Sequence, residues 1–302
     1  DVRPLALYDQ FLIHLYQRRF AEADRCGREA VAALPSTNSV TGLAILEIVW
    51  HGNVDAARRM LEAAPTSTRS EPRMVFASAL TALMAKQSDE ALRALDRLPG
   101  DFINDAWYSG PKALFIGLAH AQAGRAEAAR NAWEAGIAIL RRRLQDAPND
   151  AELHLRLGEL IAWTGQVEPA LREARLFEEL VRNRSDWTFS SARIYAALGR
   201  ADAAVPILQK FLTAAGSGRW PFTAALLQLD PLWDKLRGDV AFQRLIIENT
   251  PPRNWPLNPD LKKVTALIDG LQVIPEDFRL AEEMAARVLN ANPTDPEAVT
   301  VM

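Results

Sequence analysis

The sequence predicts an all-α fold in which helical hairpins stack into an α-solenoid, and the main observation behind this prediction is an internal repeat. A short element recurs along the first two thirds of the chain: a turn, then four residues, then an alanine that opens an apolar helix. The shared alanines are Ala23, Ala57, Ala91, Ala129, Ala170 and Ala204. They lie 34, 34, 38, 41 and 34 residues apart. A recurring step of 34 residues indicates a repeat architecture.

A second observation is the pattern of apolar residues inside each repeat. In the fifth, Leu153, Leu157 and Leu160 follow one another at intervals of four and three, which is the spacing of one face of an α-helix. Gly165 stands where this first helix ends, and glycine readily adopts the left-handed conformation of such turns. Pro169 falls in the first turn of the second helix, where its missing N–H costs little. The repeats lack the alternation of a half-buried strand, so we expect helices throughout.

Two irregular steps in the repeat have separate interpretations. The step of 38 contains LPGDFINDAWYSGP, whose glycines, prolines, Asn and Asp predict an inserted loop. The step of 41 is followed by a long second helix, because Ala129 and Pro148 are 19 residues apart whereas Ala23 and Pro35 are 12 apart. The excess of seven is close to two helical turns, so the buried face keeps its phase.

These residues resemble the tetratricopeptide repeat, a helix–turn–helix unit of 34 residues. The best match is Leu157, Gly158, Gly165 and Ala170 in the fifth unit. Further matching positions are Gly117, Gly124 and Ala129, then Tyr195, Gly199 and Ala204, and the closing prolines Pro35, Pro148 and Pro293. The first and third units depart from the pattern, with Arg18 and Lys86 at the turn glycine. The resemblance implies a superhelix that acts as a protein-interaction scaffold.

The organisation predicted along the chain has four parts. Residues 1–215 form six hairpins, 216–249 form capping helices, 250–258 form a proline-rich linker, and 259–302 begin a second, truncated array. The cap is predicted because LDPLWDKLRGDVAFQRLI follows a Gly- and Pro-containing break, and the last helix of a stack needs an apolar cover. This phrase also resembles the end of tetratricopeptide arrays in large bacterial multidomain regulatory or signalling proteins.

Charge and hydropathy exclude several classes of partner. The net charge is −3 and the pI is near 5.9, so the basic footprint of a nucleic-acid-binding domain is missing. No apolar run approaches the roughly 20 residues that span a bilayer, and a signal peptide is not visible. We therefore expect no nucleic-acid or membrane partner for this segment. The compartment stays open, with the cytoplasm favoured, and the oligomeric state is not determined.

The residues that usually carry catalysis or bind metals are scattered. The four histidines are not at metal-ligand spacing, Cys26 is the only cysteine, and no H-E-x-x-H or C-x-x-C motif occurs. We expect no enzyme activity, no cofactor and no metal, and a protein or peptide as the partner.

The resemblance implies that first helices line a concave groove. Its lining residues would be Tyr8, Leu12, Leu46, Val49, Phe76, Leu80, Leu114, Leu118, Leu155, Glu159, Phe189 and Arg193. Such an apolar lining suits an amphipathic helix or an extended peptide of a partner protein. The alternatives are that a neighbouring segment of the same protein fills the groove, or that the array is a structural spacer or a self-association module. Trp107 and Tyr108 in the inserted loop are either exposed anchors for a partner or residues that pin the loop.

Overall fold

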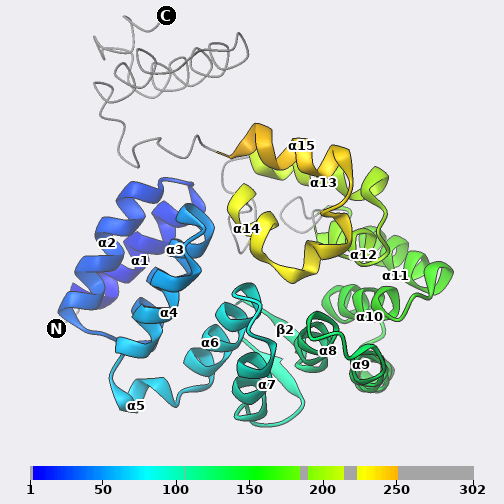
Figure 1. The fold of residues 1–302 in the computed structure, drawn as a ribbon, viewed down its shortest axis with the longest axis horizontal. Helices are drawn as coiled ribbons and strands as arrows, with labels where there is room; N and C mark the ends of the chain where they lie inside the picture. Colours follow the sequence, from blue (N-terminus) through cyan, green and yellow to red (C-terminus); the bar gives the residue numbers. More distant parts are fainter. Residues whose placement is uncertain (1–2, 106, 184–189, 214–222, 251–302) are drawn as a thin grey trace, which may run out of the picture. The chain divides into compact units, whose positions relative to one another are not determined.

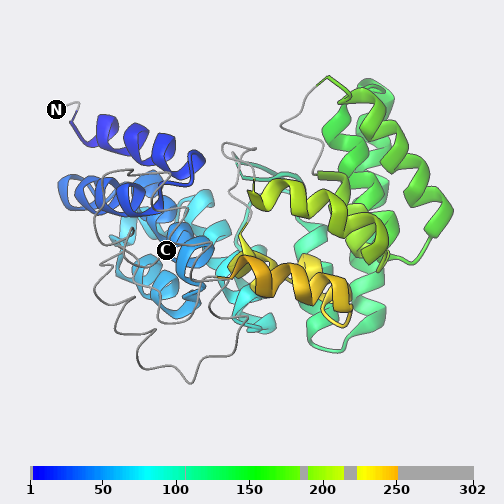
Figure 2. The same ribbon diagram turned by 90° about the horizontal axis from the view of Figure 1, so that it is seen from above.

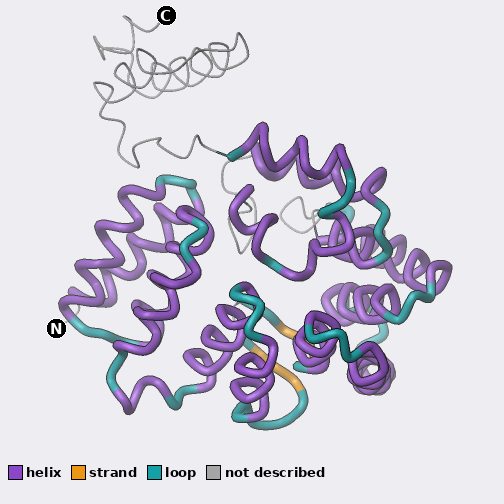
Figure 3. Tube along the Cα trace, viewed as in Figure 1, coloured by secondary structure: helices purple, strands orange, loops and turns teal. Residues whose placement is uncertain are grey.

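The computed structural model describes residues 3–105, 107–183, 190–213 and 223–250, and Figure 3 shows that these are almost entirely helical. The chain divides into two units, Asp1–Thr250 and Pro251–Met302. The second unit, which contains nearly all of the predicted linker and the predicted second array, lies outside the described residues. No helix in the described ranges is both long enough and apolar enough to cross a membrane.

Six helical hairpins follow one another in the first unit (Figure 1). Their helix pairs are α1 (Arg3–Tyr16) with α2 (Phe20–Ala33), α3 (Thr37–His51) with α4 (Val54–Ala63), α6 (Pro72–Met84) with α7 (Ser88–Asp96), α8 (Ala113–Gln122) with α9 (Ala126–Asp146), α10 (Ala151–Trp163) with α11 (Val167–Leu180), and α12 (Ser191–Ala197) with α13 (Ala201–Thr213). A single turn, α5 (Thr66–Arg69), lies between the second and third hairpins. The second helix of each hairpin packs against the first helix of the next, which confirms the predicted all-α solenoid.

Each recurring alanine is the fourth residue of the second helix of its hairpin, and all six are buried, each with at most 1% of its surface exposed. Two glycines of the first helices mark close approaches between neighbouring helices. A Cβ placed on Gly117 would lie 2.0 Å from Nε1 of Trp133 in the same hairpin, and one placed on Gly158 would lie 2.5 Å from Cδ1 of Ile194 in the next hairpin. Small residues are therefore required there because the facing side chain occupies the volume of a methyl group.

Every hairpin turns through one residue in the left-handed conformation. Gly52, Gly124, Gly165 and Gly199 have φ between 64° and 85°. Arg18 and Lys86, which replace the turn glycine in the first and third hairpins, have φ of 60° and 59°. The turn at Lys86 is closed by the N–H of Gln87, which donates to the carbonyl of Ala82 at 2.8 Å. Helix packing thus imposes the turn geometry even where no glycine makes it easy.

The two irregular units differ from the others in the predicted places. The long second helix is α9, with 21 residues. The inserted segment was predicted as a loop, but it contains two short antiparallel strands, β1 (Phe102–Asn104) and β2 (Ser109–Pro111), paired with Phe102 opposite Pro111. The guanidinium of Arg143 in α9 lies 3.7 Å from the centre of the Phe102 ring. This contact fixes the ribbon against the extended helix.

After the sixth hairpin come α14 (Ala224–Leu229), a 3-10 helix η2 (Pro231–Leu236) and α15 (Val240–Asn249). Side chains cap all three: Thr223 accepts from the N–H of Leu226, Asp230 from that of Leu232, and Asp239 from two N–H groups of α15. Helix α15 packs on α13, and η2 packs on α12. The apolar residues predicted to cover the stack are all buried, namely Leu232, Trp233, Leu236, Phe242, Leu245 and Ile246.

Candidate interaction surface

The residues predicted to line an open groove are mostly buried inside the fold. Seven of them are in the buried class: Leu46, Val49, Phe76, Leu114, Leu118, Leu155 and Glu159. Four are half-buried, namely Tyr8, Leu12, Leu80 and Arg193, while Phe189 lies outside the described residues. Most of these side chains therefore belong to the core, and they do not form an accessible apolar surface.

One reason for this burial is that a late segment of the chain returns to the first hairpins. Helix α14 packs on α3, and its Leu226 belongs to the same apolar cluster as Leu46 and Val49. At the C-terminal end of α3, a Cβ on Gly52 would lie 3.6 Å from Cβ of Ala225. Residues almost 180 positions apart therefore share one core.

The same segment also reaches the first helices of the last two hairpins. The Lys235 ammonium group in η2 donates to the carbonyl of Ala197 at the end of α12, at 2.6 Å. It also lies 4.7 Å from the centre of the Trp163 ring at the end of α10. Together α14 and η2 bridge α3, α10 and α12, so the protein's own chain fills this part of the predicted groove.

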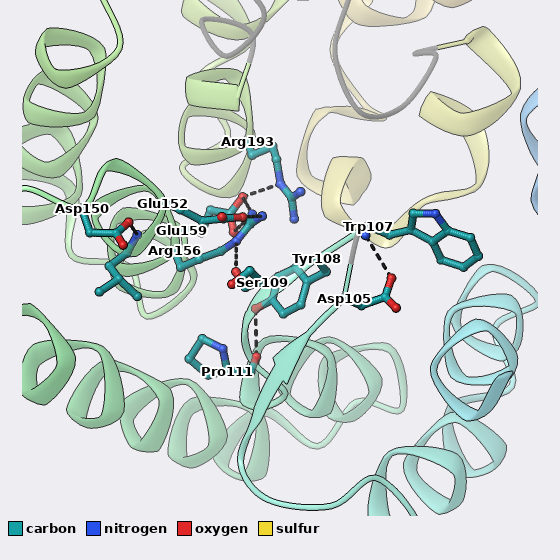
Figure 4. Close-up of polar contacts among 11 residues, drawn as sticks. Asp105, Trp107, Tyr108, Ser109, Pro111, Asp150, Glu152, Arg156, Glu159 and Arg193 are labelled. Atoms are coloured by element: carbon teal, nitrogen blue, oxygen red, sulfur yellow. Dashed lines mark hydrogen bonds and ion pairs between the residues drawn. The ribbon is translucent and has the colours of Figure 1, made fainter. Parts of the chain in front are cut away.

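The inserted ribbon covers a second part of the predicted groove. Tyr108 is buried, and its hydroxyl donates to the carbonyl of Pro111 at 2.9 Å (Figure 4). The centre of its ring lies 6.1 Å from that of Phe76 and 4.7 Å from that of Phe115. Burial raises the pKa of the Tyr108 phenol above its usual range. Of the two interpretations of this residue, the structure supports the one in which it pins the loop.

Trp107 is half-buried and also faces the protein. The Arg73 guanidinium lies 5.2 Å from the centre of its ring, and the carboxylate of Asp105 accepts a hydrogen bond from its backbone N–H at 3.0 Å (Figure 4). Arg73 in α6 also pairs with Asp105 at 2.8 Å. These contacts tie the tip of the ribbon to the third hairpin.

Glu159 of α10 is at the centre of a buried cluster of charged side chains (Figure 4). It accepts two hydrogen bonds from Arg156 at 3.1 and 3.2 Å and forms an ion pair with Arg193 of α12. Arg156 also donates to the carbonyl of Ser109 at 2.9 Å, and its guanidinium lies 4.6 Å from the centre of the Tyr108 ring. The cluster thus joins α10 to both the inserted ribbon and α12.

The charges in this cluster indicate a structural role. Burial lowers the pKa of the Arg193 guanidinium, and Glu159 partly counteracts it. Burial also disfavours the charged form of Arg156, but Glu159, Tyr108 and Glu152 together raise its pKa. Because guanidinium groups stay protonated in proteins, neither arginine can exchange a proton as a general acid or base near neutral pH.

The half-buried carboxyl group of Asp230, in the returning segment, lies near this cluster. Burial raises the pKa of Asp230 to about 6, although its hydrogen bond from Leu232 and the charges of Arg193 and Arg237 act in the opposite direction.

Among the described residues, no group of three or more His, Cys, Asp or Glu side chains could hold a metal ion. The His154 ring forms hydrogen bonds with Glu173 at 2.7 Å and with the carbonyl of Pro148 at 2.8 Å, which tie α10 to α11 and to the segment before α10.

Accessible apolar side chains occur instead on the solvent-exposed outer face of α1, the helix that begins beside the N label in Figure 2. Leu5 is 63% exposed and Ile13 is 53% exposed, and Asp9 is exposed on the same face between them. Because 34 residues separate the first two turns, this face of α1 corresponds to Ser39, Leu43 and Glu47 of α3. Those three residues are at most 7% exposed. The face of α1 that carries Leu5 and Ile13 is therefore exposed, whereas the equivalent face of α3 is buried.

Several features of the array identify its building block. The steps of 34 residues, the buried alanines, the left-handed turn residues and the close-approach glycines occur together in these hairpins. In these features the hairpins resemble tetratricopeptide repeats, as the sequence predicted.

Comparison with known proteins gives similarities of fold. No protein-family model matches the chain, and no curated protein shows a significant match. Among solved structures, MamA MSR-1 C2 is similar over 61% of this chain and 99% of its own, with a TM-score of 0.36 and 19% identity. PilF of Pseudomonas aeruginosa is similar over 82% and 97%, with a TM-score of 0.44 and 17% identity. A chain of the APC/C hetero-tetramer Cut9-Hcn1 is similar over 100% and 48%, also with 0.44 and 17%.

Sequence reasoning overlooked the outer face of α1, although a signal for it was present. Aligning the first two hairpins by their turns places Leu5 and Ile13 at positions that are buried in α3, so the apolar character of both residues could have been noticed. The return of α14 to α3 has no comparable signal. Nothing local in the α14 sequence specifies a contact so distant along the chain.

Proposed function

We propose that this protein is a non-catalytic scaffold for protein–protein interaction and that its partner protein docks on the outer face of α1. The observation that carries the proposal is the contrast between two surfaces. The predicted inner lining is filled by α14, η2 and the inserted ribbon, whereas Leu5 and Ile13 are exposed. Exposed apolar side chains that lie together on one helix face are typical of an interaction surface.

The buried charged groups support a non-catalytic role. Glu159 pairs with both Arg156 and Arg193, and Glu152 also pairs with Arg156, so these charges are compensated and hold α10 to its neighbours. Both ring nitrogens of His154 are engaged in hydrogen bonds. The net charge of −3 gives no support to a nucleic-acid partner. The open-groove version of the scaffold is disfavoured because most of its lining would have to leave the core.

A structural spacer is the second candidate function. Its support is the same filled inner side, since a solenoid whose concave residues are already packed needs no ligand to be stable. In this case the exposed face of α1 would have no partner protein.

A capture experiment distinguishes these functions. The intact chain is used as bait in lysate of its source organism, in parallel with a Leu5→Asp, Ile13→Asp double variant. A Val240→Asp variant is the matched control, because Val240 on α15 is 80% exposed and distant in sequence. We expect a protein that is captured by the wild type and the control but lost with the double variant. If the double variant captures the same protein as the wild type, docking on α1 is refuted. If neither captures a protein, the spacer function is favoured.

A further inference from the structure

The turn of the first hairpin contacts the end of the sixth hairpin. Nη1 of Arg18 donates a hydrogen bond to the carbonyl oxygen of Phe211 at 3.4 Å, although the two residues are 193 positions apart. Phe211 lies in the last turn of α13, where carbonyl groups lack a partner within the helix and a guanidinium group is a suitable donor. The six hairpins of the first unit are therefore arranged in a ring that this contact helps to close (Figure 1).

Arg18 occupies this turn at a cost that the contact with α13 explains. Its φ of 60° lies in the left-handed region, which is unfavourable for a residue with a side chain. Lys86 has the same conformation in the third hairpin, but Lys86 is exposed whereas Arg18 is half-buried. Burial lowers the pKa of the Arg18 guanidinium, so ring closure also withdraws a charge from water. An interaction across the ring gives a reason for an arginine at this position.

Helix α14 makes a second contact across the same junction. Its Leu226 belongs to the apolar cluster that lies mainly in the first two hairpins, whereas its Leu227 belongs to the cluster of the later hairpins. On the side of α3, a Cβ on Gly52 would lie 3.8 Å from Cδ1 of Leu229. On the other side, η2 follows α14 directly and its Lys235 is bonded to α12. The chain thus joins α14 to the later hairpins, while side-chain contacts join it to α3.

The same two apolar clusters meet a second time at α6. Met74 and Ala77 of this helix belong to the cluster of the first two hairpins, and Val75 and Phe76 belong to the cluster of the later hairpins. Each cluster can keep its own packing when the two bodies rotate about a helix that they share. Helix α6 is therefore placed to act as a hinge on the side of the ring where the chain is continuous.

From these contacts we propose that the ring of the first unit opens and closes. The first two hairpins move as one body about α6, and the latch consists of the Arg18–Phe211 hydrogen bond and the contact of α14 with α3. In the open state α3 loses the cover that α14 provides, so this part of the predicted inner lining becomes accessible. The device concerns a surface other than the outer face of α1 and does not depend on docking there.

The test measures the separation of the two bodies by single-molecule fluorescence energy transfer. Dyes are attached to Glu29→Cys on α2 and Ala241→Cys on α15, which are both exposed positions, in an otherwise intact chain that carries Cys26→Ala. Arg18→Gly removes the guanidinium and gives the turn the residue that adopts its conformation most easily. Lys86→Gly is the matched control, because it makes the same change in a turn of the same geometry where the side chain is exposed.

We expect Arg18→Gly to increase the population with low energy transfer by about tenfold, the factor typical of losing one hydrogen bond to a charged group. Adding Leu229→Ala should increase this population further, because it shortens an apolar side chain that lies against α3. Lys86→Gly should give the same distribution as the wild type. Circular dichroism should show the same helical content in every variant, so that low transfer reports opening of the ring.

The inference is overturned if the Arg18→Gly, Leu229→Ala double variant shows the same single population as the wild type. It is also overturned if Lys86→Gly shifts the distribution as much as Arg18→Gly does, because the effect would then come from the turns and not from the latch. A low-transfer population that appears only together with a loss of helical signal would contradict it as well, since the chain would be unfolding instead of moving about α6.

Discussion

Removing the buried carboxylate of Glu159 should destabilise the protein strongly. Glu159→Gln keeps the shape of the side chain but removes the charge that faces both Arg156 and Arg193. Breaking a buried ion pair from one side typically costs about 3–5 kcal/mol, because the remaining charge is left uncompensated. Arg193 retains 16% side-chain exposure and Arg156 retains Glu152 at 3.4 Å, so we expect a value near the lower limit, about 3 kcal/mol.

The assay is urea unfolding followed by circular dichroism and tryptophan fluorescence. The matched control is Glu248→Gln, which removes the charge from the exposed Arg244–Glu248 pair at 2.6 Å and should cost no more than about 1 kcal/mol. A double variant, Glu159→Leu with Arg193→Met, should recover part of the loss because it removes the ion pair from both sides. If Glu159→Gln costs no more than Glu248→Gln, the cluster does not hold the hairpins together.

Three further substitutions test the packing, the turns and the returning segment. Gly117→Ala should cost about 1–3 kcal/mol, because the new methyl group meets the Trp133 indole; an unchanged melting temperature would contradict this close approach. Lys86→Gly should raise the free energy of unfolding by up to about 1 kcal/mol, since the exposed lysine has φ of 59°, and a loss of stability in urea would refute the strain. Asp230→Asn should stabilise the protein at pH 7.5 by roughly 2–3 kcal/mol. The pKa of the Asp230 carboxyl is about 6 in the folded state and 3.8 in the unfolded state, so the protonated carboxyl contributes stability that is complete below pH 3.8 and is lost as pH rises through 6. The asparagine still accepts from the N–H of Leu232, so its advantage should disappear towards pH 4, and a pH-independent difference would show that titration is not the cause.

Local features of the sequence predicted the hairpins well because the interactions that form them are local. The alanines that join the two helices of a unit recur with the repeat, and each turn follows its own first helix directly. Even the departures at Arg18 and Lys86 left the prediction intact, because both residues adopt the left-handed conformation that helix packing demands. The long α9 was predictable for the same reason, since seven extra residues keep the apolar face in phase.

The inner lining could not be predicted in this way. Whether Leu46 and Val49 are open or buried depends on Leu226, almost 180 residues later in the chain, and no helical period encodes that contact. The packing of the inserted ribbon could not be predicted either, because Tyr108 contacts Phe76, Phe115 and Arg156, which come from three different helices. Its composition indicated only that the helix is interrupted.

The sequence by itself determined the repeat, its helical hairpins and the two places where the array is irregular, because those depend on side chains within one or two helical turns of each other. The tertiary structure decided which surfaces remain accessible. Accessibility depends on whether another helix is present to cover a given face: α14 covers part of α3, and no described helix covers the outer side of α1. Leu43 and Ile13 are both apolar residues on first helices, yet Leu43 is buried beside Gly27 of α2 whereas Ile13 is 53% exposed.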